Sequence, residues 1–491
     1  MTAPIVTEVP AGRMFIGGAW VGTATGRSFP TYNPATGEIL GRAPLADASD
    51  VDRAVRAAAE AQPAWAETPG PERGARLRAL ASTLRGHRED LAQLDALNSG
   101  NVIAGMRRDV DWAADSLDYF AGLIPELKGE TLPTGATALA YTVREPFGVV
   151  GKINPYNHPI RFAAEKLAAP LAAGNTVVMK PPEQAPLSSL VLARLLHELF
   201  PPGVVNVVTG DGPATGAALV RHPLVRRIAL IGSVEAGRAV MQAAGAELKT
   251  VTLELGGKNP IIIFPDVDPE EAAQAAVTAM NFNRAGQSCS STSRVFVHRR
   301  LHGAFLAALA GRVGRLRLGL PQAEETEIGP LISREQQERV LGYIETGRRE
   351  GARLVCGGGI PDDPTLRRGF YVQPTVFDGV RPEMRIAQEE IFGPVMSVLT
   401  WDDEAEMLRQ VNGVIYGLSA ALYTRDYAAA HRLARRIEAG YIWVNLPGGH
   451  ALGSPYGGIK QSGIGREECL DELLSYTQVK SIRMALPGGG I

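Results

Sequence analysis

Hydrophobic residues follow a helical period over the first quarter of the chain. Residues 51–65, 74–97 and 109–123 repeat apolar side chains at spacings of three and four, which is typical of amphipathic helices. Asp50 precedes the first of these segments and is predicted to cap its helix. The opening part of the chain is therefore predicted to be rich in helices.

After residue 136 the pattern changes to short apolar runs that alternate with helical segments. Residues 137–153 predict two extended segments that meet at Pro146. The runs that then alternate with helical patterns are residues 149–153, 175–180, 204–208 and 227–231. Strands that alternate with helices predict βαβ units on a parallel sheet.

A second series of the same kind begins near Gly256. Its apolar runs are residues 294–298, 353–359, 395–401, 419–425 and 441–445. This repetition predicts a second α/β domain, and two such domains leave a cleft between them.

Composition limits the classes of function. The 491 residues are 45% hydrophobic and 21% charged, with a formal net charge of -2, which is typical of a globular protein of two or three domains. The chain has no long basic run, so neither nucleic acid nor an anionic membrane is predicted as a partner. The chain has no secretory signal pattern and no apolar run long enough to span a membrane, so we expect a cytoplasmic protein.

Cysteine usage points to a free thiol. The three cysteines are widely separated and show no metal-ligand spacing, so neither a disulfide framework nor a metal site is predicted. Cys289 lies among Gly286, Ser288 and Ser290, whose small side chains would let a carbonyl group approach the sulfur. A buried, inert cysteine is the alternative, and the local sequence leaves both open.

Three other positions suggest chemistry on local grounds. Glu254 ends a strand-like run between leucines, where a raised pKa would suit a general base. Asn157 precedes a helical segment and could donate to an oxyanion, and Ser233 could open a helix that faces a phosphate. Glu254 could instead face solvent, and Asn157 could be a turn residue. The glycine motif around Ser233 is incomplete.

Taken together, the motifs resemble those of the aldehyde dehydrogenase superfamily, from about residue 16 to residue 482. They follow one another in family order: PYNHP (155–159), VVMKPPE (177–183), LIGSVEAG (230–237), LELGGK (253–258), GQSC (286–289), EEIFGPV (389–395) and PYGGIKQSGIGRE (455–467).

The resemblance implies an NAD-dependent oxidation of an aldehyde to a carboxylic acid. Cys289 would attack the aldehyde to form a thiohemiacetal and, after hydride loss, a thioester. Glu254 would act as general base, and Asn157 would form the oxyanion hole with the Cys289 N–H. Lys166 would relay protons from Glu254, but its family partner is placed at Gln478, which cannot accept them.

The resemblance also assigns a cofactor site. Its residues would be Ile153, Lys180, Glu183, Gly232, Ser233, Leu255, Gly256, Glu390 and Phe392. A carboxylate at position 183 would accept hydrogen bonds from a ribose hydroxyl and repel a 2'-phosphate, so NAD is expected rather than NADP.

The implied substrate pocket is more polar than is usual in the family. It would contain His158, Phe162, Glu165, Ser288, Ser290, His450 and Tyr456. Phe162 and Tyr456 keep part of an apolar wall, while His158, Glu165 and His450 replace frequent aromatic residues. A hydroxylated, charged or aromatic polar aldehyde is therefore expected.

The implied fold is α/β, with a Rossmann-like cofactor domain, a second α/β catalytic domain and a small β oligomerisation element. The expected bounds are 1–123 and 147–255 for the cofactor domain, 256–460 for the catalytic domain, and 124–146 and 473–491 for the oligomerisation element. Uncovered edge strands there predict a homodimer or homotetramer. Three other readings stay open: an enzyme that forms acyl-CoA or prefers NADP, a cysteine hydrolase, and a non-enzymatic binding protein.

Overall fold

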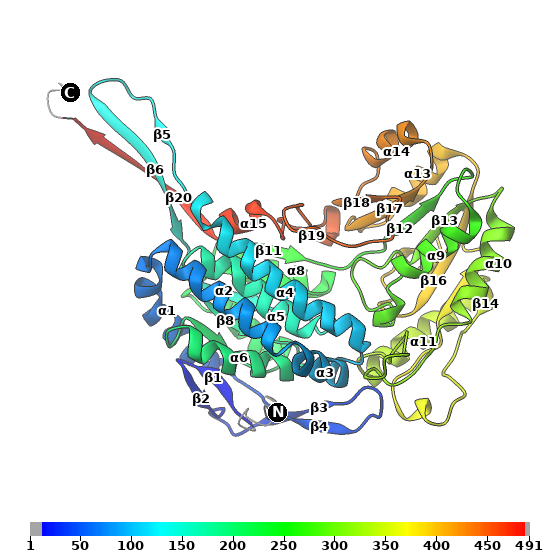
Figure 1. Ribbon diagram of the computed structural model, residues 1–491, viewed down its shortest axis with the longest axis horizontal. Helices are drawn as coiled ribbons and strands as arrows, with labels where there is room; N and C mark the ends of the chain where they lie inside the picture. The colour runs from blue at the N-terminus through cyan, green and yellow to red at the C-terminus, as the bar shows by residue number, and fades with distance from the viewer. Residues whose placement is uncertain (1–11, 487–491) are drawn as a thin grey trace.

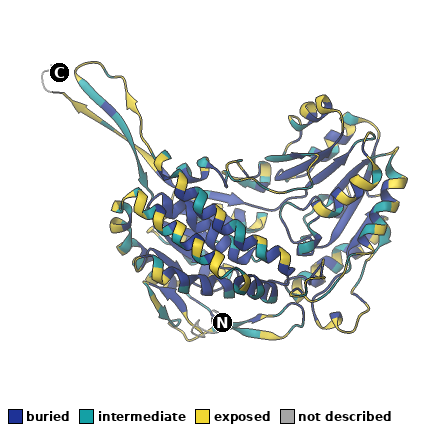
Figure 2. Ribbon diagram, viewed as in Figure 1, coloured by how far each residue is buried: buried dark blue, intermediate teal, exposed yellow. Residues whose placement is uncertain are grey.

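The structure is a computed structural model that describes residues 12–486, and two large sheets with their helices form its frame (Figure 1). A narrow three-stranded sheet projects from this frame and carries the C-terminal end of the chain. The strands of both large sheets are mostly buried, and the exposed residues lie on the outer faces of the covering helices (Figure 2).

The first sheet contains the predicted parallel strands. They are β7 (Val149–Ile153), β8 (Thr176–Lys180), β9 (Val205–Val207), β10 (Val225–Ile231) and β11 (Thr250–Glu254), in the order β11-β10-β7-β8-β9. Antiparallel strands close its edges: β1 (Met14–Ile16) and β2 (Ala19–Val21) on one side, β19 (Gly463–Ile464) on the other. The hairpin β3 (Ser28–Tyr32) and β4 (Ile39–Pro44) forms a separate small sheet.

Helices cover this sheet, as the periodicity predicts. They are α1 (Ala48–Glu67), α2 (Gly70–Gly86), α3 (Arg88–Ser99), α4 (Ile103–Leu123), α5 (Pro159–Ala172), α6 (Leu187–Leu199), α7 (Ala217–Arg221) and α8 (Val234–Gly245). The segment predicted over 74–97 divides at His87 into α2 and α3.

The predicted cap of α1 is wrong by one turn. Asp47 is the N-cap, and its carboxylate accepts hydrogen bonds from the N–H groups of Ser49 (2.8 Å) and Asp50 (3.2 Å). The Asp50 carboxylate accepts from the Asp47 N–H (3.3 Å). The two aspartates thus form a capping box, in which the second acid is already inside the helix.

The second sheet forms the other half of the frame. Its strands are β12 (Pro260–Ile263), β13 (Arg294–His298), β14 (Arg353–Cys356), β15 (Thr375–Asp378), β16 (Val395–Trp401), β17 (Ser419–Tyr423) and β18 (Tyr441–Val444), in the order β14-β15-β16-β13-β12-β17-β18. All neighbours pair in parallel except β14 with β15. Its helices are α9 (Pro269–Ala279), α10 (His302–Val313), α11 (Arg334–Arg349), α12 (Arg385–Gln388), α13 (Glu404–Asn412) and α14 (Tyr427–Ala434).

The projecting sheet combines two segments that are far apart in sequence. β6 (Ala138–Pro146) pairs antiparallel with β20 (Thr477–Ala485) over the full length of both strands, and β5 (Thr131–Leu132) pairs with the other edge of β6. The short helix α15 (Leu470–Ser475) leads into β20. The sequence predicted that these segments belong to one element, and they do pair. Residues 487–491 lie outside the described residues.

Candidate active site

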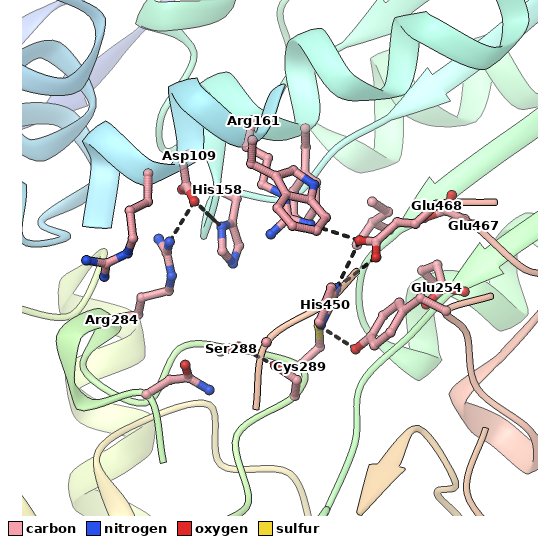
Figure 3. A pocket seen from close by; sticks show the side chains of 18 of the residues that line it. Asp109, His158, Arg161, Glu254, Arg284, Ser288, Cys289, His450, Glu467 and Glu468 are labelled. Atoms are coloured by element: carbon pink, nitrogen blue, oxygen red, sulfur yellow. Dashed lines mark hydrogen bonds and ion pairs between the residues drawn. The ribbon is translucent and has the colours of Figure 1, made fainter. Parts of the chain in front are cut away.

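Two adjoining cavities meet at the predicted catalytic residues. The charged cavity has a volume of about 320 Å³ and is bordered by α4, α5, the loop around Cys289 and the segment 449–468 (Figure 3). The second cavity has a volume of about 240 Å³. Three residues line both cavities: Ile231, Glu254 and Cys289. The sulfur and the carboxyl group therefore stand where two separately held molecules could meet.

Cys289 lies in the loop that precedes β13 and is partly exposed. Its carbonyl oxygen accepts a hydrogen bond from Asn259 Nδ2 (2.7 Å), which fixes the loop against the start of the second sheet. The Sγ atom lies 4.0 Å from Tyr456 Oη. Burial, together with the charges of Glu254 and Glu390, raises the pKa of the thiol to about 12. The cysteine is reachable, but it stays protonated near neutral pH until its surroundings change.

Glu254 is the last residue of β11, and its side chain is buried. Its Oε1 atom has no hydrogen-bond partner among the described residues. Burial and the negative charge of Glu467 raise its pKa well above the usual value, while Lys166 acts in the opposite direction. A Cβ atom at Gly256, two residues further on, would meet the Glu390 carboxylate, so a side chain there would displace that group.

Asn157 lies just before α5 and lines the second cavity. Its carbonyl oxygen accepts hydrogen bonds from Asn101 Nδ2 (3.1 Å) and Arg284 Nη1 (3.2 Å). Its own Oδ1 is buried without a hydrogen-bond partner among the described residues. The backbone of this residue is thus held firmly, while its amide group keeps capacity for a ligand.

Lys166 is buried on α5 and forms two ion pairs, with Glu165 Oε1 (2.5 Å) and Glu467 Oε2 (2.8 Å). Burial would lower its pKa, but these carboxylates raise it well above the usual value. Gln478 is exposed on β20, opposite Glu145 of β6. The expected partnership of Lys166 with position 478 is therefore wrong, because that position belongs to the projecting sheet. Glu467 is the acid beside Lys166.

Arg161 of α5 occupies the side of the charged cavity. Its Nε pairs with Glu165 Oε2 (2.7 Å) and its Nη2 with Glu468 Oε1 (2.9 Å), which His450 Nδ1 also contacts at 2.9 Å. The guanidinium lies over the Trp112 ring, 4.7 Å from its centroid. Glu165 was expected to line the pocket, but it is not among the lining residues, because it points toward the two cations of α5.

An aromatic wall faces this charge cluster. His450 stacks on Tyr456, with ring centroids 4.0 Å apart and planes inclined by 27°. Phe162 is buried at the cavity and lies 5.0 Å from the His158 ring. Beside the sulfur, the hydroxyl groups of Ser288 and Ser290 are 3.1 Å apart. These expected pocket residues all line the charged cavity.

His158 is held from behind by a buried ion pair. Its Nδ1 lies 3.1 and 3.0 Å from the two carboxylate oxygens of Asp109. Asp109 also accepts from Arg284 Nη2 (2.7 Å). Burial and the Arg284 charge lower the pKa of His158 to about 4, so the imidazole is neutral near pH 7.

The second cavity has the donors and acceptors that a dinucleotide needs. Its lining includes Gly232, Ser233, Leu255, Glu390 and Phe392, all predicted cofactor contacts. Ser233 is the N-cap of α8 and its hydroxyl accepts from the Ala236 N–H (3.1 Å), so the N–H groups of the two helical residues before Ala236 are left for an anionic phosphate. Burial raises the pKa of Glu390 to about 7, and its Oε1 accepts from the Gly257 N–H (3.2 Å). This half-buried carboxyl group suits ribose hydroxyls, so the residues fit the nicotinamide half of NAD.

Gly256 also lines this cavity, whereas the three remaining predicted cofactor contacts, Ile153, Lys180 and Glu183, do not. Ile153 is the last residue of β7, and Lys180 is the last residue of β8. Both side chains lie beside Gly216: a Cβ atom built there would be 4.0 Å from Ile153 Cδ1 and 3.6 Å from Lys180 Cδ. Lys180 Nζ pairs with Glu183 Oε2 (3.1 Å), and the Glu183 side chain is 41% exposed. Their roles at an adenosine site stay predictions.

Several residues of the charged cavity had no local sequence signal. Asp109, Trp112 and Arg161 are helical residues whose pattern only indicates a packed face. Glu467 could have been found, because it ends the GRE part of a matched motif. Nothing in the sequence around Arg284 indicates its ion pair with Asp109.

Comparisons with known proteins agree on one family. The model of the aldehyde dehydrogenase family matches residues 20–482. The aldehyde dehydrogenase tropH of Talaromyces stipitatus is 50% identical over 482 residues, which cover 97% of this chain and 93% of that protein.

Solved structures show the same fold. A putative aldehyde dehydrogenase from Burkholderia cenocepacia superposes with a TM-score of 0.95 at 40% identity, covering 98% of both chains. The NAD+ complex of an aldehyde dehydrogenase from Bacillus cereus gives a TM-score of 0.95 at 41% identity, covering 99% of both chains. The expected family and fold are confirmed: the chain belongs to the aldehyde dehydrogenase family, whose reaction is the NAD-dependent oxidation of aldehydes.

Proposed function

We propose that the protein oxidises a polar aldehyde to its carboxylic acid through a covalent intermediate on Cys289. The observation that carries the proposal is the position of Cys289 and Glu254, which both line the charged cavity and the adjoining one. An aldehyde in the first cavity would reach the sulfur from one side. Bound NAD would supply, from the other side, the hydride acceptor and a positive charge beside the sulfur.

Acylation requires the ionised sulfur. The thiolate adds to the aldehyde carbon, and the resulting oxyanion accepts hydrogen bonds from Asn157 Nδ2 and the Cys289 N–H. Loss of hydride from this thiohemiacetal leaves a thioester on Cys289. The anchored backbone of Asn157 keeps the amide in place while the charge develops.

Deacylation requires a base beside the thioester. Glu254 accepts a proton from water, and the water oxygen attacks the thioester carbon to release the acid and the thiol. The charges of Lys166 and Glu467 set the pKa of Glu254 in opposite directions. We infer that this ion pair positions and tunes the base and gives its proton a route away from the sulfur.

We predict that Glu467→Gln shifts the acid limb of the kcat profile to lower pH, by about one unit. The Glu467 charge raises the pKa of Glu254, so its removal lets the base ionise at lower pH. The measurement is kcat against pH. As the matched control, Gln478→Glu should leave the profile unchanged, because that residue is exposed on β20. A shift in the control alone would contradict the assignment.

The cofactor preference rests on Glu183. Its carboxylate, in the loop that follows β8, would accept from a ribose hydroxyl and repel a 2'-phosphate. We predict that Glu183→Ser raises kcat/KM for NADP about 10- to 100-fold, with a smaller loss for NAD. Glu198→Ser, which changes an exposed acid near the end of α6, is the control and should alter neither value. An unchanged preference in Glu183→Ser would contradict this role.

We also propose that the protein forms a homodimer or homotetramer. The projecting sheet exposes Val479 (57%) and Met484 (44%) on an edge strand that ends away from the frame (Figure 1). A second copy of the chain would pair with this edge and cover these side chains. The chemistry needs a reduced thiol, so we place the protein in a reducing compartment such as the cytoplasm. No helix within residues 12–486 has the length and hydropathy of a membrane span.

A further inference from the structure

The imidazole of His158 presents its Nε2 atom to the charged cavity. Its Nδ1 is occupied by both oxygens of Asp109, at 3.1 and 3.0 Å. Asp109 is buried on α4 and is itself fixed by the guanidinium of Arg284, at 2.7 Å. Phe162 lies 5.0 Å from the imidazole and restricts its rotation. Figure 3 shows the ring between this ion pair and the cavity.

The Asp109 carboxylate determines which nitrogen of the neutral His158 imidazole carries the hydrogen. Burial would raise the pKa of Asp109, but the Arg284 charge and the hydrogen bond from His158 keep it below the usual value, so the carboxylate only accepts hydrogen bonds. Nδ1 must then carry the hydrogen. Because burial and Arg284 lower the pKa of the imidazole, Nε2 holds a lone pair and no proton near pH 7. No residue within 12–486 donates to this nitrogen.

Apart from Glu254, which is kept for the proposed role as base, the carboxylates of the cavity are already engaged by cations. Glu468 is contacted by Arg161 and His450, and Glu467 by Lys166. Arg161 and Arg284 can only donate. Nε2 of His158 therefore stands out as an acceptor that is open to a ligand, on the residue next to the proposed oxyanion amide of Asn157.

We propose that His158 is a specificity-determining residue and that the aldehyde substrate carries a hydroxyl group, which donates its hydrogen to Nε2. This inference rests on the proposed function and narrows its substrate class. A bound aldehyde without a donor leaves the desolvated acceptor unpaired, so the enzyme discriminates against it. An ether oxygen at the same place would face a second lone pair and would be rejected in the same way.

The test compares three kinds of aldehyde that differ at one group. These are benzaldehyde, the hydroxybenzaldehydes and the matching methoxybenzaldehydes, each measured as kcat/KM for NADH formation. We expect the wild type to prefer at least one hydroxy isomer about 10- to 100-fold over both its methoxy counterpart and benzaldehyde. This series needs no variant, so it stands even if a substitution unfolds the protein.

His158→Phe assigns the preference to the side chain. The intrinsic reactivity of each aldehyde is the same with the wild type and with the variant. A change in the hydroxy-to-methoxy ratio of kcat/KM therefore reports the contact with the His158 side chain. We expect the variant to lose the preference for the hydroxy isomer while it still oxidises benzaldehyde. His431→Phe is the control, because it makes the same change at an exposed residue of α14 that lines neither cavity, and it should keep the wild-type ratio.

The outcomes separate this inference from the proposed function. Equal rates with hydroxy and methoxy substrates, or a hydroxy preference that His158→Phe keeps, would overturn the role of His158 and leave the aldehyde oxidation intact. No NADH formation with any aldehyde would overturn the proposed function itself.

Discussion

Replacing Cys289 with alanine is expected to lower kcat by about 10⁴-fold or more. The sulfur forms the bond that is cleaved in both half-reactions, and no other cysteine lines the charged cavity. The measurement is NADH formation at saturating aldehyde and NAD. Cys356→Ala is the matched control: this thiol lies on β14 of the second sheet, and its loss should leave kcat near the wild-type value. Full activity in Cys289→Ala would remove the nucleophile from the mechanism.

Replacing Glu254 with glutamine is expected to lower the steady-state rate about 10²- to 10⁴-fold and to leave one rapid turnover. Acylation survives, because the Glu254 charge raises the pKa of Cys289 and its removal makes ionisation of the thiol easier. Deacylation then limits the rate, since no base acts on the water.

The diagnostic signal is a burst of NADH equal to the concentration of active sites, recorded by stopped-flow absorbance. Glu247→Gln, which neutralises an exposed acid after α8, should show neither the burst nor the slow phase. A slow variant without a burst would mean that Glu254 is also needed to ionise the sulfur. Formation of acyl-CoA by the wild type with free coenzyme A would favour the other fate of the thioester.

Most strands of the two large sheets were predicted from short apolar runs that alternate with helical patterns, but their order across each sheet was not. Such runs report burial on both faces, which parallel strands share. The cap of α1 was misplaced because Asp47 and Asp50 are both capping residues, and only the backbone geometry distinguishes them. The break at His87 had no hydrophobic signal, because the apolar period continues from α2 into α3.

The site was predictable where the chemistry is carried by a contiguous motif. Cys289 and Glu254 each stand in such a motif, and the fold brings both to the same pair of cavities. The contact of His158 with Asp109 depends on how α4 packs against α5 across 49 positions of sequence, which no local pattern encodes. The family partner of Lys166 was wrongly placed at Gln478. The preceding helix α15 packs against α5, which carries Lys166, but the chain then enters β20, which leads away from the frame.

The central claim is that a thioester forms on Cys289. Mass spectrometry of Glu254→Gln, quenched in acid after one turnover with aldehyde and NAD, tests this most directly. Trypsin releases residues 285–294 as one peptide, and the account predicts that it gains the mass of the aldehyde less two hydrogen atoms, with the acyl group on Cys289. An unmodified peptide alongside released NADH, or an acyl group on Cys356 or Cys469 instead, would contradict the account.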